Sequence, residues 1–184
     1  MTLEAITGIG FCARTLPAGN RAFEFALGLA RRHDVRLNIF FFPTPPTRAH
    51  LPRGRRGELL RMSEEEKIEL EREVRLYYDA LLGDFINVGF RLCEGDEDPE
   101  LRRCLLIRRD YNVLVLPYDA RRRRFGHRTI EEFAEAMVCP TVLVGSRPSS
   151  RPRINTRASC WPWPERLGLA PDAWRPCVPV APER

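Results

Sequence analysis

The hydrophobic pattern alternates between two kinds of segment along most of the chain. Short apolar runs with the length of strands are followed by longer stretches whose apolar residues recur every three or four positions, which is typical of amphipathic helices. Strands separated by helices predict a parallel, doubly wound α/β sheet with right-handed crossovers and helices on both faces. The strands are expected at residues 3–11, 35–42, 86–93, 112–116 and 141–144.

Capping residues mark where the helices begin. Ser63 with Glu66, and Thr129 with Glu132, have the spacing of capping boxes. Asn20 is the expected cap of the first helix, and Asp98, followed by a first-turn proline, that of the third. The residues expected on the buried faces of the four helices are Phe23, Ala26, Leu27 and Ala30; Leu70, Val74, Tyr77, Leu81 and Phe85; Leu101, Cys104 and Leu105; and Ile130, Phe133, Ala134 and Met137.

The alternating pattern ends after the fifth predicted strand. Residues 1–146 are the predicted α/β domain, and residues 147–184 are a C-terminal extension rich in proline, arginine and tryptophan. Because prolines recur throughout the extension, we expect an irregular tail that continues neither the sheet nor a long helix. The tail holds Trp161, Trp163 and Trp174, all the tryptophans of the chain. It is therefore either loose or pinned by these aromatic residues.

Composition narrows the class of protein. The chain has 184 residues, of which 43% are hydrophobic, enough for one domain with a core and an appendage. Its six cysteines lack CxxC spacing and its three histidines are scattered, so we expect neither a zinc site nor disulfides, and a cytoplasmic location. No apolar run is long enough to cross a membrane, and Glu4 interrupts the first apolar run too early for a signal peptide.

The charged residues favour an anionic ligand or partner. The formal net charge is +5, and all but one of the basic residues are arginines, which bind carboxylate and phosphate bidentately. Arginines follow the first, second and fourth predicted strands, whose carboxyl ends share the sheet edge where open α/β proteins bind ligands. The candidate nucleotide- or anion-binding residues are Arg14, Arg121, Arg122, Arg123, Arg124, Gly126 and His127, and the candidate partner-binding residues are Arg53, Arg55, Arg56, Trp161, Trp163 and Trp174.

The run Cys139-Pro140-Thr141-Val142-Leu143-Val144 resembles the ending of universal stress proteins, which characteristically read Cys-Pro-Val-Leu-Val-Val or a near variant. The order of the elements, the long second helix and residues 22–30 are similar to that family too, so the resemblance covers roughly residues 3–146. It implies a five-stranded sheet in the order 3-2-1-4-5. It also implies a homodimer through the fifth strand, at Val142, Leu143 and Val144, and ATP binding in many members. The alternative to that dimer is a C-terminal tail that folds back and covers the exposed edge of the fifth strand.

The nucleotide-binding pattern of that family is incomplete in this chain. ATP-binding members carry an Asp at the end of strand one, where this chain reads Gly8-Ile9-Gly10-Phe11-Cys12. After strand four they carry Gly-x-x-Gly, where this chain reads Pro117-Tyr118-Asp119-Ala120. Those glycines let backbone N–H groups surround phosphates at a helix N-terminus. We therefore expect no cofactor, with ATP or AMP held by arginine side chains as the alternative.

These observations support two hypotheses for function. The first is a non-catalytic binding or docking module whose arginine-rich edge and tryptophan-rich tail engage an acidic protein partner or larger assembly. The second is a nucleotide-binding stress regulator with a degenerate, arginine-based phosphate site. RNA and anionic membrane surfaces are further candidate partners, although no RNA-binding motif occurs. The chain has no nucleophile elbow and no P-loop, so we expect no enzyme; Cys12 is either a buried structural cysteine or a redox-responsive thiol.

Overall fold

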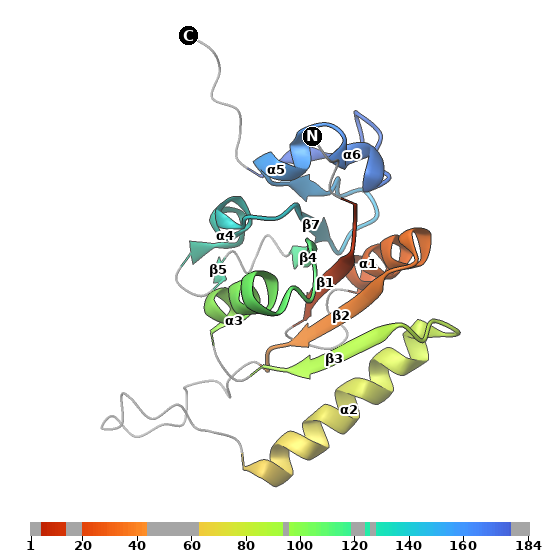
Figure 1. Cartoon of the computed structure of the whole chain (residues 1–184), viewed down its shortest axis with the longest axis vertical. Coiled ribbons are helices and arrows are strands. Elements are labelled where there is room, and N and C mark those ends of the chain that lie inside the picture. Colours follow the sequence, from red (N-terminus) through yellow and green to blue (C-terminus); the bar gives the residue numbers. More distant parts are fainter. Residues whose placement is uncertain are drawn as a thin grey trace.

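The structure, a computed structural model, describes residues 5–13, 20–43, 63–93, 96–118, 124–125 and 128–177. Figure 1 shows a twisted central sheet with helices packed around it. The strands are β1 (Gly8–Ala13), β2 (Arg36–Phe41), β3 (Val88–Leu92), β4 (Val113–Tyr118), β5 (Arg124–Phe125), β6 (Arg128–Thr129), β7 (Thr141–Gly145), β8 (Arg153–Ile154) and β9 (Arg175–Pro176). The helices are α1 (Asn20–His33), α2 (Glu64–Leu82), α3 (Glu97–Arg103) with its π-helical continuation η2 (Cys104–Arg108), α4 (Ile130–Ala136), α5 (Thr156–Ser159) and α6 (Trp163–Arg166).

The main sheet has the order β3-β2-β1-β4-β7-β8-β9. Its first five strands are all parallel, which confirms the predicted doubly wound α/β class and the order 3-2-1-4-5 that the resemblance implies. The C-terminal segment then adds two short strands, with β8 antiparallel to β7 and β9 parallel to β8. The expectation that the extension cannot continue the sheet is therefore wrong. Prolines permit this because each added strand is only two residues long.

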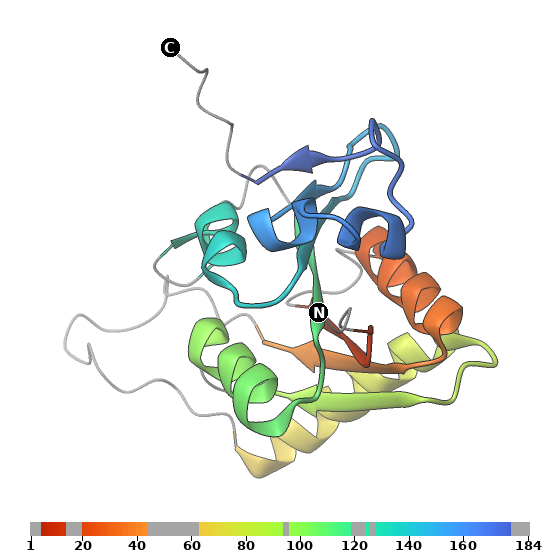
Figure 2. The ribbon, with the colours of Figure 1, turned by 45° about the horizontal axis from the view of Figure 1, so that its top comes forward.

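Alternation along the strands divides the core into two layers. In β4, Val113 and Val115 belong to one buried cluster, whereas Leu114 and Leu116 belong to the other. The first cluster includes buried residues of α1 and α2, and the second includes those of α3, η2 and α4 (Figures 1 and 2). Helices thus pack on both faces of the sheet, as is typical of a parallel sheet.

The helix starts follow the predicted caps closely. Ser63 and Glu66, and Thr129 and Glu132, each form a reciprocal capping box. The third helix begins earlier than expected, after Asp96 instead of Asp98. In α2 the buried residues are Val74, Tyr78 and Leu82, so the predicted stripe is shifted at two positions by one residue. Tyr78 is the buried member of its pair with Tyr77 because its ring packs against Phe11 and Phe23.

The observed strands begin or end a few residues away from their predicted bounds. β1 begins at Gly8 instead of residue 3, and β4 extends to Tyr118. Ile86 was expected to open the third strand, yet it is 91% exposed and the strand begins at Val88. Such shifts occur because the strand ends are decided by pairing with neighbouring strands, which apolarity alone does not reveal.

The fifth parallel strand, β7, does not form an edge of the sheet. Val142 and Leu143 pair with β8 on the side opposite β4, so the predicted exposed edge at Val142, Leu143 and Val144 is wrong. A dimer formed through this edge would first have to displace β8. The physical reason is that the chain covers its own edge, which otherwise presents unpaired N–H and C=O groups.

Asn155, directly after β8, holds this arrangement in place. Its side chain is 1% exposed. Its Oδ1 accepts hydrogen bonds from the backbone N–H groups of Thr141 and Ala158, both at 3.0 Å. Its Nδ2 donates to the carbonyl oxygens of Ala134 and Cys139, both at 2.9 Å. One buried amide therefore joins α4, β7, β8 and α5.

The rest of the C-terminal segment is anchored by a cation and by aromatic rings. The Arg21 guanidinium on α1 donates to the backbone carbonyl oxygens of Gly145, Arg147, Pro148 and Ser150. Trp163 and Trp174 are partly buried against the α1 side of the core, whereas Trp161 is 74% exposed. Of the two alternatives for this segment, loose or pinned by aromatic residues, the structure thus shows the second.

Among the described residues, no helix is long and apolar enough to cross a membrane.

Candidate functional site

Most of the predicted anion-binding residues, and the predicted partner-binding arginines, lie outside the described residues. This holds for Arg14, Arg53, Arg55, Arg56, Arg121, Arg122, Arg123, Gly126 and His127. Arg124 lies in β5, whose backbone pairs with β6 next to the start of α4. The proposed gathering of arginines at the carboxyl edge therefore stays a prediction.

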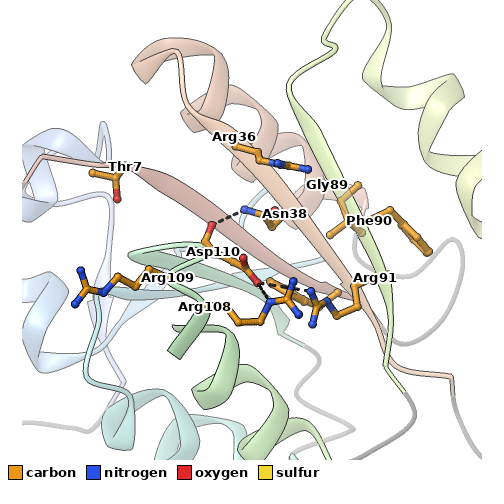
Figure 3. Close-up of a pocket in the computed structure, with 11 residues that line it drawn as sticks. Thr7, Arg36, Asn38, Gly89, Phe90, Arg91, Arg108, Arg109 and Asp110 are labelled. Carbon is orange, nitrogen blue, oxygen red and sulfur yellow. Dashed lines mark hydrogen bonds and ion pairs between the residues drawn. The ribbon is translucent and has the colours of Figure 1, made fainter. Parts of the chain in front are cut away.

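The described residues contain a different arginine cluster, which extends from the amino-terminal end of β2 along the neighbouring face of β3. It surrounds a hollow of about 360 Å³ between β2, β3 and the turn that leads from η2 into β4 (Figure 3). We call it the arginine hollow. Its polar and charged lining residues are Thr7, Arg36, Asn38, Arg91, Arg108, Arg109 and Asp110.

Alternation along two strands places these side chains on one face. In β2 the residues Leu37 and Ile39 join the α1 and α2 side of the core, so Arg36 and Asn38 project to the opposite face. In β3 the same alternation directs Arg91 to that face. Gly89 in β3 leaves room for the side chains of Asn38 and Arg36. A Cβ at this position would lie 2.5 Å from Asn38 Oδ1 and 3.0 Å from Arg36 Nε.

The third wall of the arginine hollow is positioned by Arg109, a residue in the left-handed backbone conformation. Arg109 has φ +54° and ends η2, with the backbone N–H of Asp110 bonded to the carbonyl of Cys104 at 3.0 Å. This turn presents Arg108 and Arg109 at a helix C-terminus, where cations interact favourably with the helix dipole. Asn38 ties the turn to the sheet, since its Nδ2 donates to the backbone carbonyl of Asp110.

The hollow carries an excess of positive charge. The Asp110 carboxylate lies 3.2 Å from Arg108 Nε and 3.9 Å from a terminal nitrogen of Arg91. Figure 3 shows those two arginines converging on Asp110, with Arg36 above Asn38 and Arg109 on the side of Thr7. Within the described part of the chain, neither Arg36 nor Arg109 forms an ion pair. Asp110 thus offsets part of the charge and leaves guanidinium groups available for an external anion.

Sequence reasoning missed this cluster although a signal was present. Arg36 and Asn38 interrupt the second strand at alternate positions, and Arg91 does so in the third. A strand covered on both faces should be apolar throughout, so these residues mark an uncovered part of one face. The arginines in the loops after the strands instead predicted a site at the carboxyl ends of the strands.

The cysteines are mostly buried among the side chains of the α3 and α4 layer. Cys12 is 1% exposed, so it matches the expected structural cysteine and lacks the exposure of a redox-responsive thiol. Burial raises the pKa of the Cys93, Cys139 and Cys177 thiols to about 12. Cys160 is the exposed exception. Among the described residues, no three His, Cys, Asp or Glu side chains are grouped to hold a metal ion.

Comparison with known proteins bears on the fold. No family model matches the sequence, and no curated protein matches it. Universal stress protein UspA from Lactobacillus plantarum is similar in structure, with a TM-score of 0.54, 15% sequence identity, and coverage of 78% of this chain and 99% of that chain. A universal stress protein from Archaeoglobus fulgidus is similar with a TM-score of 0.50, 14% identity, and coverage of 76% of this chain and 93% of that chain. The chain therefore has a universal-stress-protein-like fold.

Proposed function

We propose that this chain is a non-catalytic docking module that binds a carboxylate-rich segment of a protein partner in the arginine hollow. The observation that carries the proposal is the convergence of Arg36, Arg91 and Arg108 on one polar hollow with a single carboxylate, Asp110, among them. Each guanidinium can bind a carboxylate through two parallel hydrogen bonds.

The lining favours carboxylates over a nucleotide. Ile39 and Phe40 are 1% and 2% exposed, so neither offers a ring or side-chain face on which a base could stack. The Phe90 ring is covered by the guanidinium of Arg75, which lies 5.1 Å from the ring centroid. The hollow also lies at the C-terminal end of η2, whereas phosphates are favoured at helix N-termini. A nucleotide site at Arg121–Arg124, Gly126 and His127 stays the alternative prediction.

The test measures binding of a fluorescein-labelled peptide that alternates Glu and Gly, with a Gln and Gly peptide as the uncharged control. Arg36→Gln with Arg91→Gln removes two cations of the hollow, and Arg72→Gln with Arg157→Gln removes two exposed cations elsewhere. Since an exposed ion pair contributes about 0.2–1 kcal/mol and two pairs are lost, the hollow variant should bind about twofold to thirtyfold more weakly, and the control variant should bind as the natural chain does.

Asp110→Asn tests the same site through an expected rise in peptide affinity. Removing the internal carboxylate frees Arg108 and Arg91 for the peptide, so affinity should rise about threefold at low salt and the gain should shrink as salt is added. Equal affinity in the hollow and control variants would refute the site. Thermal stabilisation by ATP, ADP or AMP, without binding of the acidic peptide, would instead favour the nucleotide alternative.

A further inference from the structure

A second hollow lies entirely within the C-terminal segment and has the opposite character. It measures about 600 Å³, and its walls include Trp161, Pro164, Glu165, Leu169, Pro171 and Trp174. We call it the tryptophan groove. It belongs to the β8 and β9 end of the sheet, whereas the arginine hollow lies at the β3 end (Figure 1).

The walls of the tryptophan groove are held by the fold. The backbone N–H of Leu169 donates to the carbonyl of Pro164 at 2.8 Å, and that of Leu167 donates to the carbonyl of Trp163 at 2.9 Å. Leu167 is 1% exposed and joins the main core. The neighbouring turn is therefore a fixed support, which lowers the entropy lost when a ligand binds.

Aromatic exposure is concentrated at this groove. Trp161 is 74% exposed, and it is the one aromatic residue classed as exposed among those whose side chains the structure describes. Across the groove, the Trp174 indole Nε1 is shielded from solvent and has no hydrogen-bond acceptor among the described residues. An exposed tryptophan and a second, half-buried tryptophan lining one concave surface are features of a binding site for flat apolar groups.

The charge of the groove indicates what it binds. Glu165 is the one charged residue in its lining, and within the described part of the chain its carboxylate forms no ion pair. A ligand that combines flat apolar rings with a cation would match both the aromatic walls and this carboxylate.

We propose that the tryptophan groove binds a proline-rich peptide segment that carries a basic residue. Proline-rich segments adopt the extended polyproline II conformation before binding and pack their rings against aromatic-lined grooves. In this chain Trp161 and Trp174 supply the aromatic walls against which the proline rings pack, and Glu165 binds the basic side chain. This site is independent of the acidic partner proposed for the arginine hollow.

Binding is measured by fluorescence anisotropy with a labelled peptide that repeats Pro-Pro-Arg, on the full chain and its variants. A Gly-Gly-Arg repeat keeps the charge and removes the prolines, and a Pro-Pro-Glu repeat reverses the charge. Because the carboxylates of Pro-Pro-Glu suit the arginine hollow, the three peptides are compared on the Arg36→Gln, Arg91→Gln variant, where only Pro-Pro-Arg should bind with saturation. It should also shift the intrinsic tryptophan fluorescence, because all three tryptophans of the chain lie in this segment.

Trp161→Ala should weaken binding about tenfold, and Glu165→Gln about threefold with a smaller salt dependence. Both residues are exposed, so the fold should persist. Ile86→Ala, which removes an exposed apolar side chain elsewhere, should bind as the natural chain does. Equal binding of Gly-Gly-Arg, or full affinity in Trp161→Ala, would overturn the proposal; so would an equal fluorescence shift with tetramethylammonium alone, which would indicate a small-cation site.

Discussion

Replacing Asn155 with alanine should detach the C-terminal segment from the sheet. The side chain makes four hydrogen bonds to backbone groups, and all four are in a buried setting. A hydrogen bond contributes a net of roughly 0.5–1.5 kcal/mol, so losing four of them should lower the free energy of unfolding by about 2–6 kcal/mol. This would be among the largest effects expected for one substitution.

The assay is urea denaturation followed by two signals. Circular dichroism reports the helices of the whole chain, whereas tryptophan fluorescence reports residues 161–174 alone because they hold every tryptophan. In the natural chain the two transitions should coincide, as for one cooperative unit. In Asn155→Ala the fluorescence transition should move to lower urea than the dichroism transition, because the segment loses its link to β7.

Asn112→Ala is the matched control. Asn112 also bridges distant backbone, accepting from the N–H of Thr7 at 2.9 Å and donating to the carbonyl of Ala5 at 2.7 Å, but these bonds are exposed to solvent. Water can replace them, so the loss should be about 1 kcal/mol. A cost for Asn155→Ala no larger than that of the control would refute the assigned role of the buried amide.

Three further predictions concern thiols, pH and capping. At neutral pH an aromatic disulfide reagent should react rapidly with Cys160 and slowly with the five buried cysteines; two or more rapid thiols would contradict this burial. Stability should fall as pH rises above about 9, because unfolded thiols then lose protons while Cys93, Cys139 and Cys177 keep theirs until about 12. Urea midpoints across this range check the effect, and Cys139→Ala should show a smaller decline. Thr129→Ala should lower the free energy of unfolding by about 1 kcal/mol through loss of the α4 cap, and Thr129→Ser should restore most of it, as measured by urea denaturation.

Local signals explain why much of the fold could be predicted from the sequence. The capping boxes at Ser63 and Thr129 involve residues three positions apart, and the continuous apolar run of β4 is visible within six residues. Pairing of β8 with β7 depends instead on two residues, Arg153 and Ile154, and on the distant amide network of Asn155. A strand of two residues is too short to produce a periodic pattern in the sequence.

The arginine hollow escaped prediction for a related reason. Arg36, Arg91 and Arg108 lie far apart in the sequence and meet only through the register of β2 with β3 and the left-handed turn at Arg109. The sequence predicts Trp161, Trp163 and Trp174 together as partner-binding residues. The structure separates them, because Trp161 and Trp174 line the groove whereas Trp163 is not among its lining residues and packs against the core.

Pro176 limits hydrogen bonding at the β9 edge of the sheet. The backbone N–H groups of Arg175 and Cys177 point inward to β8, so the position between them faces outward, and proline has no N–H to offer there. At this position a neighbouring molecule finds no main-chain donor with which to extend the ladder, and Arg175 adds like-charge repulsion between copies. Within the described part of the chain, the sheet thus ends on one side at a residue that disfavours fibre-like stacking, and on the other side at β3.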